Sequence, residues 1–156
     1  MKSKITIVLV AAIAPLLLGN LSGGGTSSSS SAKHEKYFQK GVIAHEAKDY
    51  DTALELYRKA LKIKPDYADA LNNLGFTLRT IGKQYFDEAD EAYAKVLTLD
   101  SNHHEALEYQ GELYLWQGKI SKANENYQRL LDLGSDEAAE LKKKIDEVLS
   151  DARKVL

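Results

Sequence analysis

The feature that most constrains the fold of this chain is an internal repeat. The segments YFQKGVIAH, LNNLGFTLR and LEYQGELYL align on Gly41, Gly75 and Gly111, which lie 34 and 36 residues apart. Three further segments, YDTALELYRKAL, FDEADEAYAKVL and ISKANENYQRLL, align on alanines at spacings of 36 and 34 residues. A single period of 34 residues explains both sets if two residues are inserted near Gln84 and Tyr85. Such a period is typical of a fold that stacks copies of one small unit.

Each unit is predicted to form two helices joined by a turn. In the first unit apolar residues recur at helical spacing around Gly41 and again from Ala53 to Leu61. The intervening AKDYD has no such period, and the later units place Gly82 and Gly118 there. A glycine inside a helix costs about 1 kcal/mol relative to alanine. Its recurrence in three first helices therefore predicts a close approach of the partner helix, which only a hydrogen atom permits.

This pattern resembles the tetratricopeptide repeat, a unit of 34 residues with a small residue at position 8, alanine at position 20 and an aromatic residue at position 24. Here position 8 is the aligned glycine, position 20 the aligned alanine, and position 24 is Tyr57, Tyr93 and Tyr127. The resemblance implies an all-α fold, a right-handed solenoid of three helix-turn-helix repeats with a concave inner groove. The repeats are assigned to residues 34–67, 68–103 and 104–134.

Two further segments flank the repeats. Residues 25–33 are rich in glycine and serine, which predicts a flexible linker, either native or added to the natural chain. Residues 135–156 carry Leu141, Ile145 and Val148 on one stripe, with lysine and acid on the rest of the surface. This amphipathic segment predicts a capping helix that closes the stack, because a terminal element needs one wet face. Seven helices are therefore expected.

The beginning of the chain has the order of a secretory signal. Lys2 and Lys4 precede an uncharged apolar run from Ile5 to Leu18, and small residues follow up to Gly24. This order predicts a signal peptide over residues 1–24 and an exported protein, periplasmic or secreted. The alternative is an uncleaved signal anchor, which would be the protein's contact with a membrane.

The resemblance implies that partners bind to the inner side of the first helices. The residues expected there are Phe38, Val42, Asn73, Phe76, Arg79, Glu105, Glu108, Tyr109, Glu112, Leu115 and Trp116. Their aromatic and apolar members exceed what one buried stripe needs, and an apolar patch with a polar rim is typical of a binding site. The alternative is that some of these aromatic residues are core, and in particular that Trp116 packs beside the C-terminal helix.

The charges of this surface bear on the kind of partner. One member of the family binds acidic chain ends with a clamp of lysine, asparagine and arginine, whose positions here hold Phe38, Val42, Asn73, Glu105 and Tyr109. Only the asparagine matches, and the acids would repel a carboxylate. The sequence therefore favours a protein or peptide partner with an apolar segment and basic flanks.

Composition argues against other classes of function. The chain has no cysteine and a net charge of −2, which excludes thiol chemistry and gives nucleic-acid binding little support. His103 and His104 precede Glu105, but adjacent side chains on a helix point about 100° apart, so we expect polar surface rather than a metal site. No cofactor and no enzymatic activity are predicted. The hypothesis is a non-catalytic scaffold in envelope complex assembly, and the alternative is self-assembly through the same groove.

Overall fold

The computed structural model describes residues 27–154, which are helical apart from short turns. The α-helices of this part are α1 (Ser27–Glu46), α2 (Tyr50–Ile63), α3 (Ala68–Ile81), α4 (Phe86–Leu99), α5 (His104–Trp116), α6 (Ile120–Asp132) and α7 (Glu137–Lys154). One turn of 3₁₀ helix, η1 (Lys83–Tyr85), precedes α4 at the place of the predicted two-residue insertion. The predicted signal peptide over residues 1–24 lies outside the described residues, as do residues 155–156 of the capping segment.

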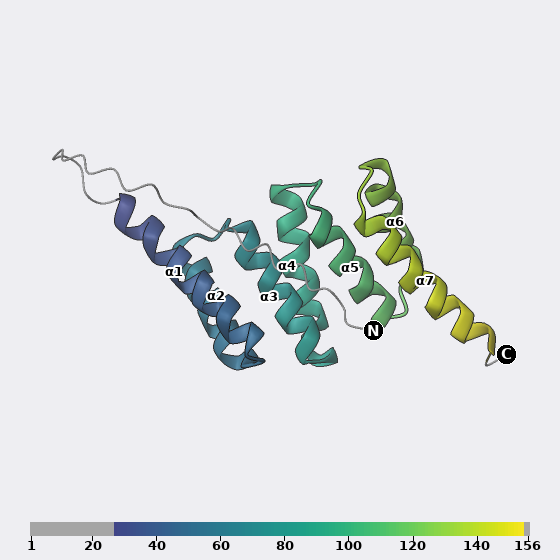
Figure 1. The fold of residues 1–156 in the computed structure, drawn as a ribbon, viewed down its shortest axis with the longest axis horizontal. Helices are drawn as coiled ribbons and strands as arrows, with labels where there is room; N and C mark the ends of the chain where they lie inside the picture. The colour runs from purple at the N-terminus through teal and green to yellow at the C-terminus, as the bar shows by residue number, and fades with distance from the viewer. Residues whose placement is uncertain (1–26, 155–156) are drawn as a thin grey trace.

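The helices form a row of three pairs, α1 with α2, α3 with α4 and α5 with α6, and α7 packs on both helices of the last pair. Figure 1 shows α1 and α7 at opposite ends of this row. Along the row α1 contacts α3, α3 contacts α5 and α5 contacts α7, whereas no backbone contact within residues 27–154 joins α2 to α4 or α4 to α6. The row therefore curves around the layer of α1, α3, α5 and α7, which forms its inner face. The predicted all-α solenoid with a terminal helix is confirmed.

The repeated glycines lie where the partner side chains leave no room. A Cβ atom on Gly41 would lie 2.6 Å from Cε1 of Tyr57, and one on Gly75 would lie 2.9 Å from Cε1 of Tyr93. Both distances are shorter than a normal van der Waals contact, so the close approach predicted from the sequence is confirmed. In the third repeat the place of the tyrosine ring is taken by Leu141 of α7, whose Cδ2 would lie 2.6 Å from a Cβ on Gly111.

The turns between the helices follow from local sequence. The Asp49 side chain caps α2 by accepting a hydrogen bond from the Thr52 amide at 3.2 Å. Gly118 has a φ of 73° in the turn before α6, a left-handed conformation that glycine adopts without strain. The equivalent residue of the first repeat is Lys48, which has a φ of 61° without that freedom.

The beginning of α1 differs from the expected linker. The sequence predicts a flexible linker over residues 25–33, but α1 begins at Ser27, so residues 27–33 are helical. Once a helix is nucleated by packing, each added residue gains a hydrogen bond at little further cost, and serine is only moderately unfavourable in a helix. The packed part of α1 from His34 onward therefore extends toward the N-terminus through the serines.

Candidate partner-binding face

The inner face carries the residues for which the sequence predicts partner binding. Phe38 and Val42 come from α1, and Asn73, Phe76 and Arg79 from α3, while α5 contributes Glu105, Glu108, Tyr109, Glu112, Leu115 and Trp116. Their burial differs widely. Two of them are core residues, three form a strip of rings, and most of the polar ones bond to a neighbouring helix.

Phe38 and Leu115 are not on the surface where the sequence placed them. Phe38 is 9% exposed, and its ring centroid lies 5.1 Å from that of Tyr67, which covers it from the turn before α3. Leu115 is 7% exposed and belongs to the apolar cluster between α5, α6 and α7. The prediction that these two side chains are open to a partner is corrected for the same reason in both cases: the next unit along the row packs over them.

A strip of aromatic rings crosses the inner face from α3 to the end of α5. The ring centroids of Phe76 and Tyr109 lie 5.0 Å apart, and the ring of His45 on α1 lies 5.1 Å from that of Phe76. Phe76 and Tyr109 are half-buried, whereas Trp116 is 53% exposed. Burial, followed by the charges of Glu105 and Glu108, raises the pKa of Tyr109 to about 12, so its hydroxyl group stays neutral. The strip thus offers apolar ring surface with a neutral hydroxyl.

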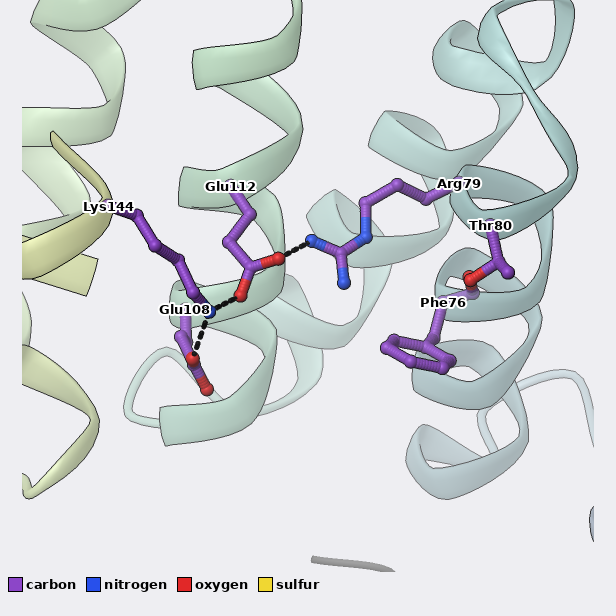
Figure 2. Close-up of polar contacts among 6 residues, drawn as sticks. All are labelled: Phe76, Arg79, Thr80, Glu108, Glu112 and Lys144. Carbon is purple, nitrogen blue, oxygen red and sulfur yellow. Dashed lines mark hydrogen bonds and ion pairs between the residues drawn. The ribbon is translucent and has the colours of Figure 1, made fainter. Parts of the chain in front are cut away.

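Arg79 lies beneath this strip rather than reaching out to a ligand. Its guanidinium carbon lies 5.2 Å, 5.3 Å and 5.0 Å from the ring centroids of Phe76, Tyr109 and Trp116. Figure 2 shows the guanidinium group turned toward the carboxylate of Glu112, with which it forms an ion pair. Arg79 is only 4% exposed. The cation that the sequence assigned to a partner is therefore held by three rings and one carboxylate of the protein.

Glu112 joins three helices. Besides its pair with Arg79 on α3, its other carboxylate oxygen pairs with Lys144, which reaches across from α7 (Figure 2). Lys144 also pairs with Glu108 at 3.0 Å. Two of the acids that gave the predicted groove its negative charge are thus neutralised within the chain. The charge of this part of the inner face is close to balanced.

Hydrogen bonds between successive repeats occupy several other polar groups. Tyr67 donates to Glu35 at 2.6 Å, and Asn72 donates to Glu105 at 3.1 Å. His45 Nδ1 lies 2.8 Å from Thr77 Oγ1. The residues of these pairs are 32 or 33 positions apart, close to the repeat length, because each bond joins similar places on neighbouring units. Hydrogen bonds between side chains of the protein therefore connect successive repeats along the inner face.

Three further acids gather at one end of the face. Asp69, Glu105 and Glu137 each lie in the first turn of a helix, on α3, α5 and α7 respectively. Burial raises the pKa of Glu105, and the charges of Glu137, Glu108 and Asp69 raise it further. A basic group placed here would relieve that repulsion. This end is consequently suited to a cation from a partner.

The other predicted residues have simple local environments. Val42 is half-buried against the apolar cluster, and Asn73 donates from its side chain to the carbonyl of Asp69 at 2.9 Å. His103 caps α5 by accepting a hydrogen bond from the Ala106 amide at 3.2 Å. Within residues 27–154 there is no group of three or more His, Asp and Glu side chains that could hold a metal ion. In the same range no helix is long and apolar enough to cross a membrane.

Lys144 and Tyr67 take part in this face although the sequence did not single them out. Lys144 lies one period of 34 residues after Gln110, so extending the register into the last helix would have placed it beside α5. The spacing of Asn72 and Glu105 carries the same signal. A spacing close to the repeat length indicates which residues can lie side by side on neighbouring repeats, but it does not indicate which of them form a bond.

Models of the tetratricopeptide repeat match residues 37–82, 68–103 and 105–133. Together these matches run through all three helix pairs. The chain belongs to the tetratricopeptide-repeat family, as the resemblance in its sequence implied.

Particular relatives share this repeat architecture. The photosystem I assembly protein Ycf3 of Prochlorococcus marinus is 31% identical over 110 residues, which are 67% of this chain and 61% of the relative. Heat shock protein STI1 of Saccharomyces cerevisiae is 27% identical over 114 residues, 73% of this chain and 19% of that protein. The chain thus spans less than two thirds of the length of these relatives.

Solved structures agree with the fold. The first TPR domain of Spaghetti (RPAP3), bound to the HSP90 peptide SRMEEVD, has a TM-score of 0.69 and 22% identity over 77% of this chain and 95% of that one. The TPR2B domain of yeast Sti1 in its complex with Hsp70 has a TM-score of 0.69 and 18% identity over 77% of this chain and 98% of that one. At these identities the likeness establishes the architecture.

Proposed function

We propose that this protein is a non-catalytic interaction scaffold that binds a peptide segment of a partner protein on its inner face. The observation that carries the proposal is the aromatic strip of Phe76, Tyr109 and Trp116, which keeps ring surface accessible beside an acidic end. A few partly buried aromatic residues often supply most of the affinity of an interface. Structures of similar fold bound to peptides, and a relative that is an assembly protein, support the same class of function.

The preferred segment is apolar with lysine or arginine at its flank. Apolar side chains would cover the strip, and the basic flank would lie near Asp69 and Glu105, where burial and then repulsion among carboxylates raise the pKa of Glu105. An acidic chain end would add to that repulsion. Arg79, which could have attracted it, is already paired with Glu112. The HSP90 peptide SRMEEVD bound to the similar TPR domain has an acidic end, so it is a poor model for the ligand proposed here.

The setting that we propose is the bacterial cell envelope. The basic, apolar and small-residue order of residues 1–24 supports export, with cleavage near Gly24 or retention as an anchor. N-terminal sequencing of the protein recovered from outside the cytoplasm tests this step. A chain found in the cytoplasm with its first residues intact would remove the envelope from the proposal without affecting the binding face.

The binding face is tested with two synthetic peptides that share a leucine- and phenylalanine-rich centre and differ only in lysine or glutamate flanks. Fluorescence anisotropy should show tighter binding of the lysine peptide. Phe76→Ala combined with Tyr109→Ala should weaken it at least tenfold, about 1.4 kcal/mol. Leu99→Ala is the matched control, because Leu99 is 46% exposed on α4 and lies outside the inner face.

A second variant separates binding from folding. Tyr109 packs partly against the core, so circular dichroism must show that the double alanine variant keeps its helices. Thr80→Arg leaves both rings in place and sets a positive charge at the exposed end of α3, one helical turn from Phe76 (Figure 2). It should weaken the lysine peptide more than the glutamate peptide. Equal binding by the wild type and both variants would place the site elsewhere.

A further inference from the structure

The end of the row away from α1 is incompletely covered. A hollow of about 960 Å³ lies there between α6 and α7. Tyr127 and Leu131 of α6 line one side, with Ala138 and Ala139 from the start of α7. Leu131 is 46% exposed, which is unusual for a leucine at a helix contact. Apolar surface is therefore open at the terminal unit.

The first two repeats show that this surface is normally covered. Tyr57 and Tyr93 are fully buried, whereas Tyr127 at the same repeat position is only half-buried. Likewise, the leucines of the first two repeats that correspond to Leu131 pack against the core. The difference arises because Leu141 of α7 takes the space beside Gly111, while the part of α6 around Leu131 stays exposed. A further helix would complete the layer.

The exposed side of α7 indicates which helix fits. Going along α7, the lining of the hollow presents Ala138 and Ala139, then Lys142 and Lys143, then Asp146 and Glu147, then Ser150, Asp151 and Lys154. Two cations and then two anions stand in the middle of this series, between the small residues Ala139 and Ser150. If the order of these central charges is reversed, each cation stands opposite an anion of the original order. A second α7 running antiparallel would meet opposite charges at the four central positions.

We propose that the hollow is the interface of a homodimer in which the α7 helices of two copies pack antiparallel about a two-fold axis between residues 144 and 145. Lys142 then faces Glu147 of the second copy, Lys143 faces Asp146, and the two-fold axis repeats both pairs. Ala139 faces Ser150, and these small side chains let the helix backbones approach. The interface is closed because each copy presents the same patch.

The existing contacts of α7 are compatible with this arrangement. Lys142 pairs with Asp146 of its own chain at 2.6 Å, but both side chains are about half exposed, at 43% and 58%. Exposed pairs of this kind are worth little, so their exchange for contacts across the interface costs little. Leu131 and Tyr127 of both copies would lie at the edges of the helix pair and lose their contact with water.

The test uses the full chain and two charge variants. An acidic variant carries Lys142→Glu and Lys143→Glu, so that all four charged positions are negative. A basic variant carries Asp146→Lys and Glu147→Lys, so that all four are positive. Light scattering should give the mass of a dimer for the wild type, with weaker association in high salt. Each variant alone should be monomeric, and an equimolar mixture of the two should recover the dimer.

Further variants separate this interface from other modes of association. Leu131→Asp should abolish the dimer, whereas Ile43→Asp should not, although Ile43 is the more exposed at 64% and lies on α1 at the other end of the row. Circular dichroism checks that each variant keeps its helices. A mixture that stays monomeric, dimers in either charge variant alone, or loss of the dimer in Ile43→Asp would overturn the proposal. So would a wild type that is monomeric up to about 1 mM.

Discussion

The ion pair between Arg79 and Glu112 offers the sharpest test of how the inner face is stabilised. Arg79 is 4% exposed and Glu112 9%, and the pair joins α3 to α5 with Lys144 attached from α7. Glu112→Gln keeps the size and shape of the side chain but removes the negative charge. Arg79 would then be a buried cation whose remaining neighbours are aromatic rings.

Breaking a buried pair in this way costs about 3–5 kcal/mol, because the remaining charge has lost its hydration without a counter-charge. For a protein of this size each kcal/mol lowers the melting temperature by about 3 °C or more, so the shift should be on the order of 10 °C. Chemical denaturation followed by circular dichroism measures the free energy directly. The midpoint should fall while the slope stays the same.

The control is another arginine–glutamate pair between neighbouring repeats. Arg58 on α2 and Glu88 on α4 are 2.6 Å apart, but their side chains are 49% and 42% exposed. Glu88→Gln should cost less than about 1 kcal/mol, since water replaces the lost partner. Both substitutions remove the same chemical group from the same type of pair. Their difference therefore reflects burial together with the second ion pair that Glu112 makes with Lys144.

A third variant tests whether the unpaired buried charge causes the loss of stability. Arg79→Met with Glu112→Leu replaces both charges by apolar groups of similar length, and such replacements of buried pairs are often neutral or stabilising. The double variant should consequently be more stable than Glu112→Gln alone. If Glu112→Gln and Glu88→Gln cost the same within about 0.5 kcal/mol, a typical limit for independent effects, the burial argument is refuted. The salt dependence expected of an exposed acid would then apply to Glu112.

Three further predictions concern the repeat packing, a turn and pH. Gly75→Leu should destabilise by about 1–3 kcal/mol because its side chain meets the Tyr93 ring; thermal melting checks this against Ala94→Leu on exposed α4 surface, and an unchanged melting temperature would contradict the tight contact. Lys48→Gly should stabilise by up to about 1 kcal/mol because Lys48 has a φ of 61°, whereas Lys48→Ala keeps the strain and should gain nothing. Burial lowers the pKa of His45, so the folded state binds fewer protons than the unfolded state. The contribution of His45 to stability should therefore be complete above the ordinary histidine pKa of about 6.5 and fall as the pH drops below it. Melting curves of His45→Gln should show a smaller loss of stability at low pH.

Much of the fold could be predicted because its determinants repeat within one unit. Gly41 and Tyr57 recur one period later as Gly75 and Tyr93, and each pair reports the same contact between the helices of one repeat. Apolar spacing then places the helices, and turns follow at residues such as Gly118. All of this information lies within a few turns of helix, where sequence distance and spatial distance are closely linked.

The candidate face could be predicted only in outline. The sequence placed Phe76 and Tyr109 together on the inner side, and the structure brings their rings to 5.0 Å. It also placed Phe38 and Leu115 there, and both are core. Whether a residue at the edge of a helix face is open or covered depends on the rotation of the next unit, and no local pattern encodes that rotation.

The sequence alone therefore determined the repeat unit, the order of its helices and the layer that faces inward, because these follow from periodic contacts inside each unit. Tertiary structure alone decided which polar groups of that layer remain available. Arg79 and Glu112 look like ligand-binding charges in the sequence, yet they pair with each other, and Lys144 joins them from a helix outside the repeats. The physical reason is that an ion pair depends on the distance between two charged groups, and for groups on different repeats that distance is set by how the units stack.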